Sequence, residues 1–478
     1  MDVSESTREF PVAGDWESGG HSAQVRAPFD GSIIATVPQF GAADIDRAVE
    51  VGRVALRTNP LPRHKRAAIL DLAAQNLEQR KESIARTLAL EAAKPITQAR
   101  GEVDRAASTL RFSAAGARTI GGEYVPLDAS AAGEGHIGFV MRRPIGVVGA
   151  ICPFNFPLNL VAHKVGPAIA AGCPVVVKPA GQTPLSALAL ASALFDAGLP
   201  LEYLSVVPGP GSQVGSALVD HPDVALISFT GSPPVGWAIR QRAPRKRVGL
   251  ELGNNSPLII CEDADVDRAA AGVRLAGFGH AGQSCISTQR ILVAESVKLR
   301  FIEALVDQVE SLVVGDPLSE ETEVSAMIST DERDRVAGWI QAAVENGASV
   351  ATGGTLTPEG VLRPTVLIDA RPDDEVCADE IFGPVVVVRG YSQLSEAVAE
   401  ANDTKYGLQA AIFTDKFDVA MMAVQELDFG GVLVNEVPTW RADQMPYGGL
   451  RDSGNTREGP AWAIHEMTEE RLVVLRLP

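Results

Sequence analysis

A single cysteine in the segment FGHAGQSCISTQR, residues 278–290, has a side chain that could act as a nucleophile. Cys285 ends an Ala- and Gly-rich apolar stretch and has polar neighbours. A thiolate can attack a carbonyl carbon and hold the acyl group as a thioester, whereas many buried thiols are inert packing residues. The segment alone leaves both interpretations open, so partners for the thiol must come from other parts of the chain.

An amide and a carboxylate are candidate partners for such a nucleophile. Asn155 lies in CPFNFP, residues 152–157, where prolines on both sides hold it in a rigid turn, so that its amide can donate hydrogen bonds to an oxyanion. Glu251 lies between apolar residues in LELGNNSP, residues 250–257, and burial there would raise the pKa of its carboxyl toward that of a general base. A turn-forming Asn and a capping or solvated Glu are the alternatives.

Two further segments have features of a dinucleotide-binding site. Lys178 ends the apolar run VVVK, so its amine reaches the carboxyl edge of a parallel sheet, where it can bind ribose or phosphate or simply extend into solvent. In SFTGSPPVG, residues 228–236, a strand runs into Gly231 and a helix begins at the prolines, and free N–H groups at a helix start suit a pyrophosphate. The GxxxxG spacing differs from the GxGxxG fingerprint, so neither segment alone establishes a dinucleotide site.

The elements that must position these residues follow a βαβ alternation. Helical periodicity extends from 42 to 120, and short β-prone runs alternate with helical stretches from 145 to 260. A second alternation follows residue 260, which predicts two α/β units with ligands at the carboxyl ends of their strands. Gly and Pro punctuation at 123–142 predicts a hairpin excursion, and the terminal run ERLVVLRLP needs a pairing partner, which another subunit could supply.

The composition limits the class of protein. With 478 residues, 46% hydrophobic and 21% charged, the chain can form two or three globular domains. Its net charge of −18 would repel nucleic acid and anionic membranes, and its five cysteines have no CxxC spacing, which disfavours disulfides and a metal site. The N-terminus has no signal-peptide pattern and no apolar stretch is long enough to span a bilayer, so we expect a soluble, cytoplasmic protein.

Eight ordered motifs resemble those of the NAD(P)-dependent aldehyde dehydrogenase superfamily, from about residue 25 to the end of the chain. They are PFNFP, VVKPA, FTGSPPVG, ELG, GQSC, EIFGPV at 380–385, NDTKYGL at 402–408 and MPYGGLRDSG at 445–454. The resemblance implies a non-acylating, hydrolytic enzyme. It implies that Cys285 is the nucleophile, that Asn155 holds the oxyanion and that Glu251 activates water to hydrolyse the thioester.

The same resemblance implies a cofactor site. Its residues are Lys178, Gly181, Gly211, Gly231, Ser232, Gly236, Leu252, Glu380 and Phe382. Two positions depart from the family pattern: ELGNNSP stands where ELGGKSP is common, and Gly181 stands where many NAD-preferring members have a Glu for the adenosine 2′-hydroxyl. Without that carboxylate a 2′-phosphate meets less repulsion, so the expected cofactor is NAD or NADP.

The substrate class is less defined than the reaction. The resemblance is to members that oxidise small functionalised aldehydes, while Phe156 and Trp440 could instead line a pocket for an aromatic aldehyde. Arg441 is the third candidate substrate residue, and we expect a structural role for Arg290. A CoA-acylating relative and a non-catalytic protein that keeps the fold are the rival functions; Glu251 disfavours the first, and the complete set of catalytic residue types disfavours the second.

The predicted fold is a three-layer α/β aldehyde dehydrogenase-like fold with three parts. Residues 1–122 and 143–249 would form a Rossmann-type dinucleotide-binding domain, residues 250–454 an α/β catalytic domain, and residues 123–142 and 455–478 a β oligomerisation arm. An arm of this kind predicts a homodimer or homotetramer.

Overall fold

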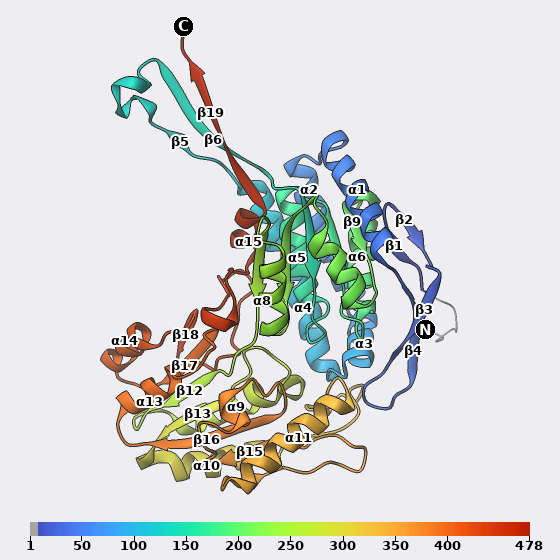
Figure 1. The fold of residues 1–478 in the computed structure, drawn as a ribbon. Coiled ribbons are helices and arrows are strands. Elements are labelled where there is room, and N and C mark those ends of the chain that lie inside the picture. Colours follow the sequence, from blue (N-terminus) through green and yellow to red (C-terminus); the bar gives the residue numbers. More distant parts are fainter. Residues whose placement is uncertain (1–7) are drawn as a thin grey trace.

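A computed structural model describes residues 8–478 and shows two sheets covered by helices, with a narrow arm that projects from them (Figure 1). The C-terminus lies at the tip of the arm (Figure 1). The α/β class with mainly parallel sheets, which the alternation of elements predicts, is confirmed. No helix within the described range is long and apolar enough to cross a membrane.

The first sheet is wholly parallel and has the order β11-β10-β7-β8-β9. Its strands are β7 (Val147–Ile151), β8 (Val175–Lys178), β9 (Leu204–Val206), β10 (Val224–Thr230) and β11 (Arg247–Glu251). The run VVVK is almost fully buried because helices cover both faces of the sheet. The chain builds outward from β7 in one direction through β8 and in the other through β10, so a ligand crevice is expected beside the carboxyl end of β7.

Two groups of helices form the outer layers of this unit. Helices α5 (Asn159–Ala171) and α6 (Pro184–Asp196) pack together on one side, with α2 (Arg63–Gln79) and α4 (Ile96–Thr119) outside them. The second group is α1 (Ala42–Thr58), α7 (Ser216–Asp220) and α8 (Pro233–Arg242), which contact one another in turn, while α3 (Lys81–Ala92) packs on α4 and α6. The result is the three-layer arrangement.

The second sheet has the order β14-β15-β16-β13-β12-β17-β18 and is parallel except for β14. Its strands are β12 (Pro257–Ile260), β13 (Arg290–Ala294), β14 (Ser349–Thr352), β15 (Thr365–Ile368), β16 (Val385–Tyr391), β17 (Gln409–Phe413) and β18 (Gly431–Val434). The helices of this unit are α9 (Val266–Phe278), α10 (Glu295–Glu310), α11 (Thr330–Glu345), α12 (Glu375–Ala378), α13 (Leu394–Asn402) and α14 (Phe417–Glu426).

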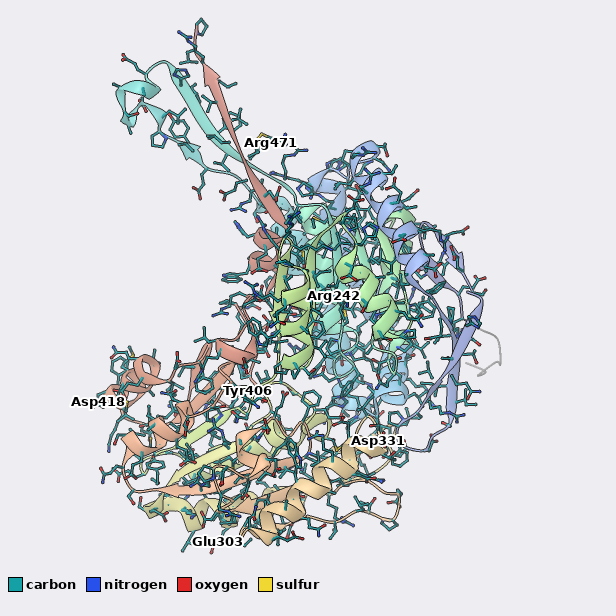
Figure 2. All side chains as sticks on the ribbon, viewed as in Figure 1. Arg242, Glu303, Asp331, Tyr406, Asp418 and Arg471 are labelled. Atoms are coloured by element: carbon teal, nitrogen blue, oxygen red, sulfur yellow. The ribbon has the colours of Figure 1, made fainter. Side chains whose placement is uncertain are left out.

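The arm is a three-stranded antiparallel sheet of β5 (Tyr124–Val125), β6 (His136–Pro144) and β19 (Thr468–Arg476). The terminal strand therefore pairs with β6 of its own chain over its whole length, from Thr468 opposite Pro144 to Arg476 opposite His136. Its side chains, such as that of Arg471, stand clear of the two main units (Figure 2). Within residues 8–478 the outer edge of β19 pairs with no other strand.

Two segments outside these three sheets complete the fold. Helix α15 (Pro460–Glu466) packs on α4 and α5, so the chain contacts the first unit before it enters the arm. Residues 8–41 form two hairpins, one of β1 (Phe10–Val12) with β2 (Asp15–Glu17) and one of β3 (His21–Arg26) with β4 (Ile33–Gln39).

Candidate active site

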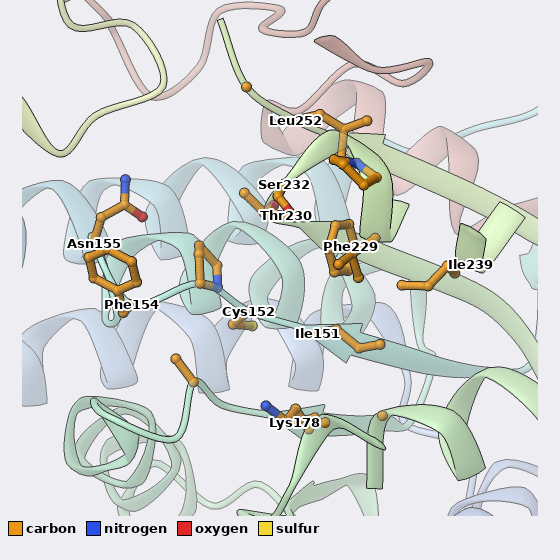
Figure 3. Close-up of a pocket in the computed structure, with 18 of the residues that line it drawn as sticks. Ile151, Cys152, Phe154, Asn155, Lys178, Phe229, Thr230, Ser232, Ile239 and Leu252 are labelled. Carbon is orange, nitrogen blue, oxygen red and sulfur yellow. The ribbon is translucent and has the colours of Figure 1, made fainter. Parts of the chain in front are cut away.

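A cleft of about 1080 Å³ runs along the carboxyl edge of the first sheet. Cys285 and Asn155 both line it, together with residues of β8, β10 and α8. In Figure 3, Asn155 lies at the left of the view, Lys178 lies lower down, and Ser232 and Leu252 lie to the right of Asn155. The cleft thus lies at the switch point between β7 and β10, where the strand order predicts a ligand.

Cys285 follows a tight turn at the end of α9. Three successive residues in this turn, His280, Ala281 and Gly282, have φ values of 49°, 53° and 68°, in the left-handed region. A Cβ on Gly282 would collide with the main-chain carbonyl of Gly383, so only glycine fits there. Backbone strain of this kind is tolerated where the surrounding structure fixes the turn, and here it sets the position of the thiol.

Asn155 is held from two sides. Its Nδ2 donates a hydrogen bond of 3.0 Å to the main-chain oxygen of Gln283, two residues before Cys285, and Lys94 Nζ donates one of 2.8 Å to the Asn155 main-chain oxygen. The side chain is 3% exposed. An amide nitrogen has two N–H groups, so one stays available for a ligand next to the thiol.

Among residues 8–478, the thiol of Cys285 has one polar contact, a distance of 2.8 Å between its Sγ and Tyr447 Oη. Burial raises the pKa of the thiol to about 12, although the Tyr447 hydroxyl opposes this shift. The guanidinium of Arg441 lies 3.9 Å from the centre of the Tyr447 ring, a cation–π contact. The resting form is therefore the thiol, and a base must accept its proton when the sulfur reacts.

Glu251 ends β11 and is 4% exposed. Neither of its carboxylate oxygens accepts a hydrogen bond from residues 8–478. Burial raises its pKa well above the ordinary value and the charge of Glu458 raises it further, while Lys164 and Arg441 oppose the shift. A buried carboxyl with a raised pKa and free oxygens has the properties of a general base that acts near neutral pH.

Most of the predicted cofactor residues line the cleft. They are Lys178, Gly181, Gly211, Gly231, Ser232, Leu252, Glu380 and Phe382. Gly236 lies one turn into α8, outside the residues that line the cleft, and a Cβ there would press on Leu252. Its role in cofactor binding stays a prediction.

The cleft has the shape and chemistry that a dinucleotide needs. Glycines at 181 and 211 leave open space, since a Cβ at either position would meet no atom of residues 8–478 within 4 Å. Glu380 is partly buried, and its carboxyl accepts a hydrogen bond of 3.1 Å from Asn254 N; desolvation raises its pKa to about 8. The ring of Phe382 meets that of Phe154 edge-on at 5.8 Å. Lys178, Ser232 and the start of α8 can hold phosphate and ribose, and Glu380 can hold ribose hydroxyls.

The two asparagines that depart from the family motif are structural. Asn254 Nδ2 donates to Ser256 Oγ at 2.8 Å and to Gln409 O at 3.1 Å, and Asn255 Nδ2 donates to Cys377 O at 2.9 Å. Both side chains are buried. The two asparagines therefore brace the loop behind Glu251, and neither is among the residues that line the cleft.

The predicted substrate residues lie in three different settings. Phe156 packs under Lys94 Nζ, 3.8 Å from the ring centre, and edge-on to His280, outside the cleft lining. Trp440 is 51% exposed. Arg441 is connected to the reactive group through Tyr447.

Arg290 has the structural role predicted for it. Its guanidinium donates hydrogen bonds of 2.9 to 3.1 Å to the main-chain oxygens of Asn255, Glu400 and Ala401. These bonds connect β13 to the neighbouring loop and to α13. The Arg290 guanidinium therefore binds groups of the protein itself.

Sequence reasoning missed three residues near the thiol: Tyr447, Glu458 and His163. Tyr447 lies inside the motif MPYGGLRDSG, but a phenol there has no visible partner in the sequence, because Cys285 is 162 residues away. Arg441 Nη2 donates to Glu458 Oε2 at 2.7 Å and lies 3.4 Å from His163 Nε2. Only the folded chain brings these side chains together.

Comparison with known proteins agrees with this geometry. Residues 16–473 match the model of the aldehyde dehydrogenase family. A 3-sulfolactaldehyde dehydrogenase from Priestia aryabhattai is 43% identical over 466 residues, 98% of this chain and 97% of that protein. The crystal structure of aldehyde dehydrogenase 21 from Physcomitrella patens, in complex with the reaction product succinate, has a TM-score of 0.95 and 39% identity over 99% of each chain.

A third relative bears on the cofactor. The glyceraldehyde-3-phosphate dehydrogenase GapN from Methanocaldococcus jannaschii, complexed with NADP, has a TM-score of 0.91 and 35% identity, and the match covers 96% of this chain and 100% of that one. Such identity over the whole length establishes family as well as fold. The chain therefore belongs to the aldehyde dehydrogenase family and is an NAD(P)-dependent enzyme that oxidises an aldehyde.

Proposed function

We propose that this enzyme oxidises a small functionalised aldehyde to its carboxylic acid through a thioester on Cys285. The observation that supports this most is the convergence of three groups: a thiol and an amide at the wall of the cleft, and a buried carboxyl with two free oxygens among the described residues. Each matches one need of acyl transfer, namely a nucleophile, an oxyanion donor and a base.

In the first step the sulfur of Cys285 bonds to the carbonyl carbon, and the π electrons of the C=O bond move to oxygen. The free N–H of the Asn155 amide donates to that oxygen, and its fixed position makes the stabilisation preorganised. The thiol proton passes to a base. The product of this step is a thiohemiacetal on the protein.

Lys178, Ser232 and Glu380, which line the cleft, would hold the cofactor. When bound, oxidised NAD or NADP supplies the hydride acceptor for the carbon attached to sulfur. Cys285 lies in the wall of the same cleft, so the covalent intermediate is formed beside the cofactor site.

In the last step Glu251 removes a proton from water, and the water oxygen attacks the thioester carbon. The C–S bond breaks, the sulfur regains its proton and the acid leaves. The role requires an ionised carboxylate with accessible lone pairs, and both Glu251 oxygens are free of hydrogen bonds within residues 8–478. This residue also favours water over CoA as the acceptor.

The relatives support a small substrate with polar groups. Their names include 3-sulfolactaldehyde dehydrogenase and lactaldehyde dehydrogenase. The aromatic alternative has less support, because Phe156 packs on Lys94 and Trp440 is half exposed.

The test is a screen of aldehydes with NAD and with NADP, followed by NAD(P)H absorbance, with the product identified as free acid or acyl-CoA in the presence of CoA. We expect the free acid and no reaction with Cys285→Ala. Hydride transfer that survives in Cys285→Ala would overturn the assignment of the nucleophile, and formation of acyl-CoA would overturn hydrolysis.

A further inference from the structure

A cluster of buried polar side chains adjoins Cys285 outside the residues that line the cofactor cleft. We call Tyr447, Arg441, Glu458, His163 and Glu251 the acyl-side cluster. All five are buried. They come from β11, α5 and the loops after β18, so they come together only in the tertiary structure.

Direct contacts connect four of these side chains to the thiol. Tyr447 Oη lies 2.8 Å from Cys285 Sγ, and the Arg441 guanidinium lies 3.9 Å from the Tyr447 ring centre. Arg441 Nη2 then donates to Glu458 Oε2 at 2.7 Å and lies 3.4 Å from His163 Nε2. Because each group is fixed by the next, the phenol hydroxyl is held in place beside the sulfur.

The acyl-side cluster also has hydrogen-bonding capacity that the protein does not use. Five of its atoms are buried and have no hydrogen-bond partner in residues 8–478: Arg441 Nε, Glu458 Oε1, His163 Nδ1, Glu251 Oε1 and Glu251 Oε2. Buried polar atoms nearly always find a partner, so five unpaired atoms in one cluster indicate that a polar ligand or water completes them. An aromatic aldehyde would bury these atoms against an apolar ring and leave them unpaired.

We propose that the enzyme selects aldehydes with a hydroxyl group on the carbon next to the carbonyl, and that Tyr447 is the residue that recognises this hydroxyl, with Arg441 behind it. This proposal rests on the covalent chemistry proposed above and names its substrate class. The hydroxyl oxygen of such a substrate is two bonds from the carbon that bonds to Cys285 Sγ. It therefore comes within reach of a Tyr447 Oη that lies 2.8 Å from the same sulfur.

The attack itself frees the phenol for this contact. Before the reaction the Tyr447 hydroxyl is paired with the thiol, and after the C–S bond forms the sulfur is a poor hydrogen-bond acceptor. The Tyr447 hydroxyl then pairs with the substrate hydroxyl, which can donate or accept. Burial raises the pKa of Tyr447 well above its ordinary value, so the phenol keeps the proton that it donates.

The experiment compares 2-hydroxypropanal with propanal, which differ only in that hydroxyl. For the wild-type enzyme we expect kcat/KM to favour 2-hydroxypropanal by about tenfold to a hundredfold. In Tyr447→Phe this ratio should fall to near one, because the hydroxyaldehyde loses a contact that propanal never makes, in addition to any change in activity that the two aldehydes share. The matched control is Tyr391→Phe, a buried tyrosine whose Oη donates to Ile260 O at 3.1 Å in the second sheet, and it should leave the ratio unchanged.

Each other outcome contradicts the proposal in a distinct way. An equal loss of kcat/KM for both aldehydes in Tyr447→Phe would show that the phenol interacts with the thiol and does not recognise the substrate hydroxyl. A wild-type enzyme with equal kcat/KM for the two aldehydes would exclude hydroxyl recognition. Neither result affects aldehyde oxidation through Cys285, whereas failure to oxidise any aldehyde would remove the proposed function instead. If Tyr447→Phe does not fold, product inhibition of the wild-type enzyme decides: 2-hydroxypropanoate should inhibit about tenfold more strongly than propanoate, and equal inhibition would overturn the proposal.

Discussion

At the scale of single residues, the environment of each group decides its chemistry more than its identity does. Nothing in the sequence distinguishes the carboxyl of Glu251 from others. In the structure, burial and the charge of Glu458 raise its pKa, and its two oxygens accept no hydrogen bond from residues 8–478. Glu458, by contrast, stays ionised: although burial opposes it, the charges of His163, Arg441 and Lys164 lower its pKa to about 2. The pKa values of two neighbouring carboxyls are thus shifted in opposite directions, which is typical of acid–base sites.

The first prediction concerns Glu251→Gln. The variant should form the thioester but hydrolyse it slowly, so that one equivalent of NAD(P)H appears in a burst and steady-state turnover falls by about 10² to 10⁴. Rapid-mixing absorbance measures both phases. Loss of the burst together with turnover would contradict a role confined to deacylation.

The pH dependence of the wild-type enzyme gives the second prediction. A base acts when it is ionised, and the raised pKa of Glu251 keeps it protonated at pH values where an exposed carboxyl has already lost its proton. Deacylation should therefore rise with pH above the ordinary carboxyl range, and Glu251→Gln should abolish this limb of the profile. A limb that persists in the variant would assign the titration to another group.

Gly181 provides the third prediction, on cofactor choice. A side chain fits at this position, because a Cβ would meet no atom of the described chain within 4 Å, and Gly181 lines the cleft. Gly181→Glu should lower kcat/KM for NADP by about tenfold or more through repulsion of the 2′-phosphate, with a smaller change for NAD. Gly181→Gln controls for bulk without charge, and an equal effect of both substitutions would rule out electrostatic selection.

At the scale of elements, the turn between α9 and Cys285 is the most constrained segment near the site. Its three left-handed residues and the close approach of Gly282 to Gly383 hold the thiol at the wall of the cleft. The apolar helix before it, with buried Val273 and Phe278, anchors this turn in the core of the second unit. The helix therefore holds the turn rigidly, and the turn sets the position of the Cys285 thiol.

The fourth prediction is that Gly282→Ala lowers the free energy of unfolding by about 1 to 3 kcal/mol and reduces activity, because the methyl group collides with a backbone carbonyl. Gly338→Ala is the matched control. That glycine lies inside α11 with open space around it, so alanine should stabilise the protein by about 0.4 to 1 kcal/mol. Denaturant unfolding of both variants checks the pair, and a neutral Gly282→Ala would refute the collision.

At the scale of the whole molecule, the arm is the feature that a single chain does not explain. It projects from the two main units, and its strand β19 has an unpaired edge within residues 8–478 (Figure 1). Leu472 and Val474, on one face of β19, are 57% and 48% exposed. An exposed apolar strand edge favours association, and the homodimer or homotetramer stays a prediction.

The fifth prediction tests this surface. The double substitution Leu472→Glu and Val474→Glu should shift the mass in solution toward the monomer, because charges on the exposed face of β19 oppose its burial. Leu299→Glu is the control, since Leu299 is 76% exposed on α10, far along the chain from the arm. Sedimentation of the three proteins measures the mass, and a wild-type monomer or an unchanged mass in the double variant would contradict the arm as the interface.

The sequence by itself determined the α/β alternation, the strand that delivers Lys178 and the residue types of the catalytic set, because these follow from local periodicity and from motifs of a few adjacent residues. It did not determine that β19 pairs with β6 of the same chain or that Tyr447 contacts Cys285. Those facts depend on contacts between residues more than 160 positions apart. The local sequence pattern of a single tyrosine or a short apolar strand is the same for any partner that it contacts in the folded chain. Only the tertiary structure decided which polar atoms surround the sulfur, because burial and pairing are properties of the assembled interior.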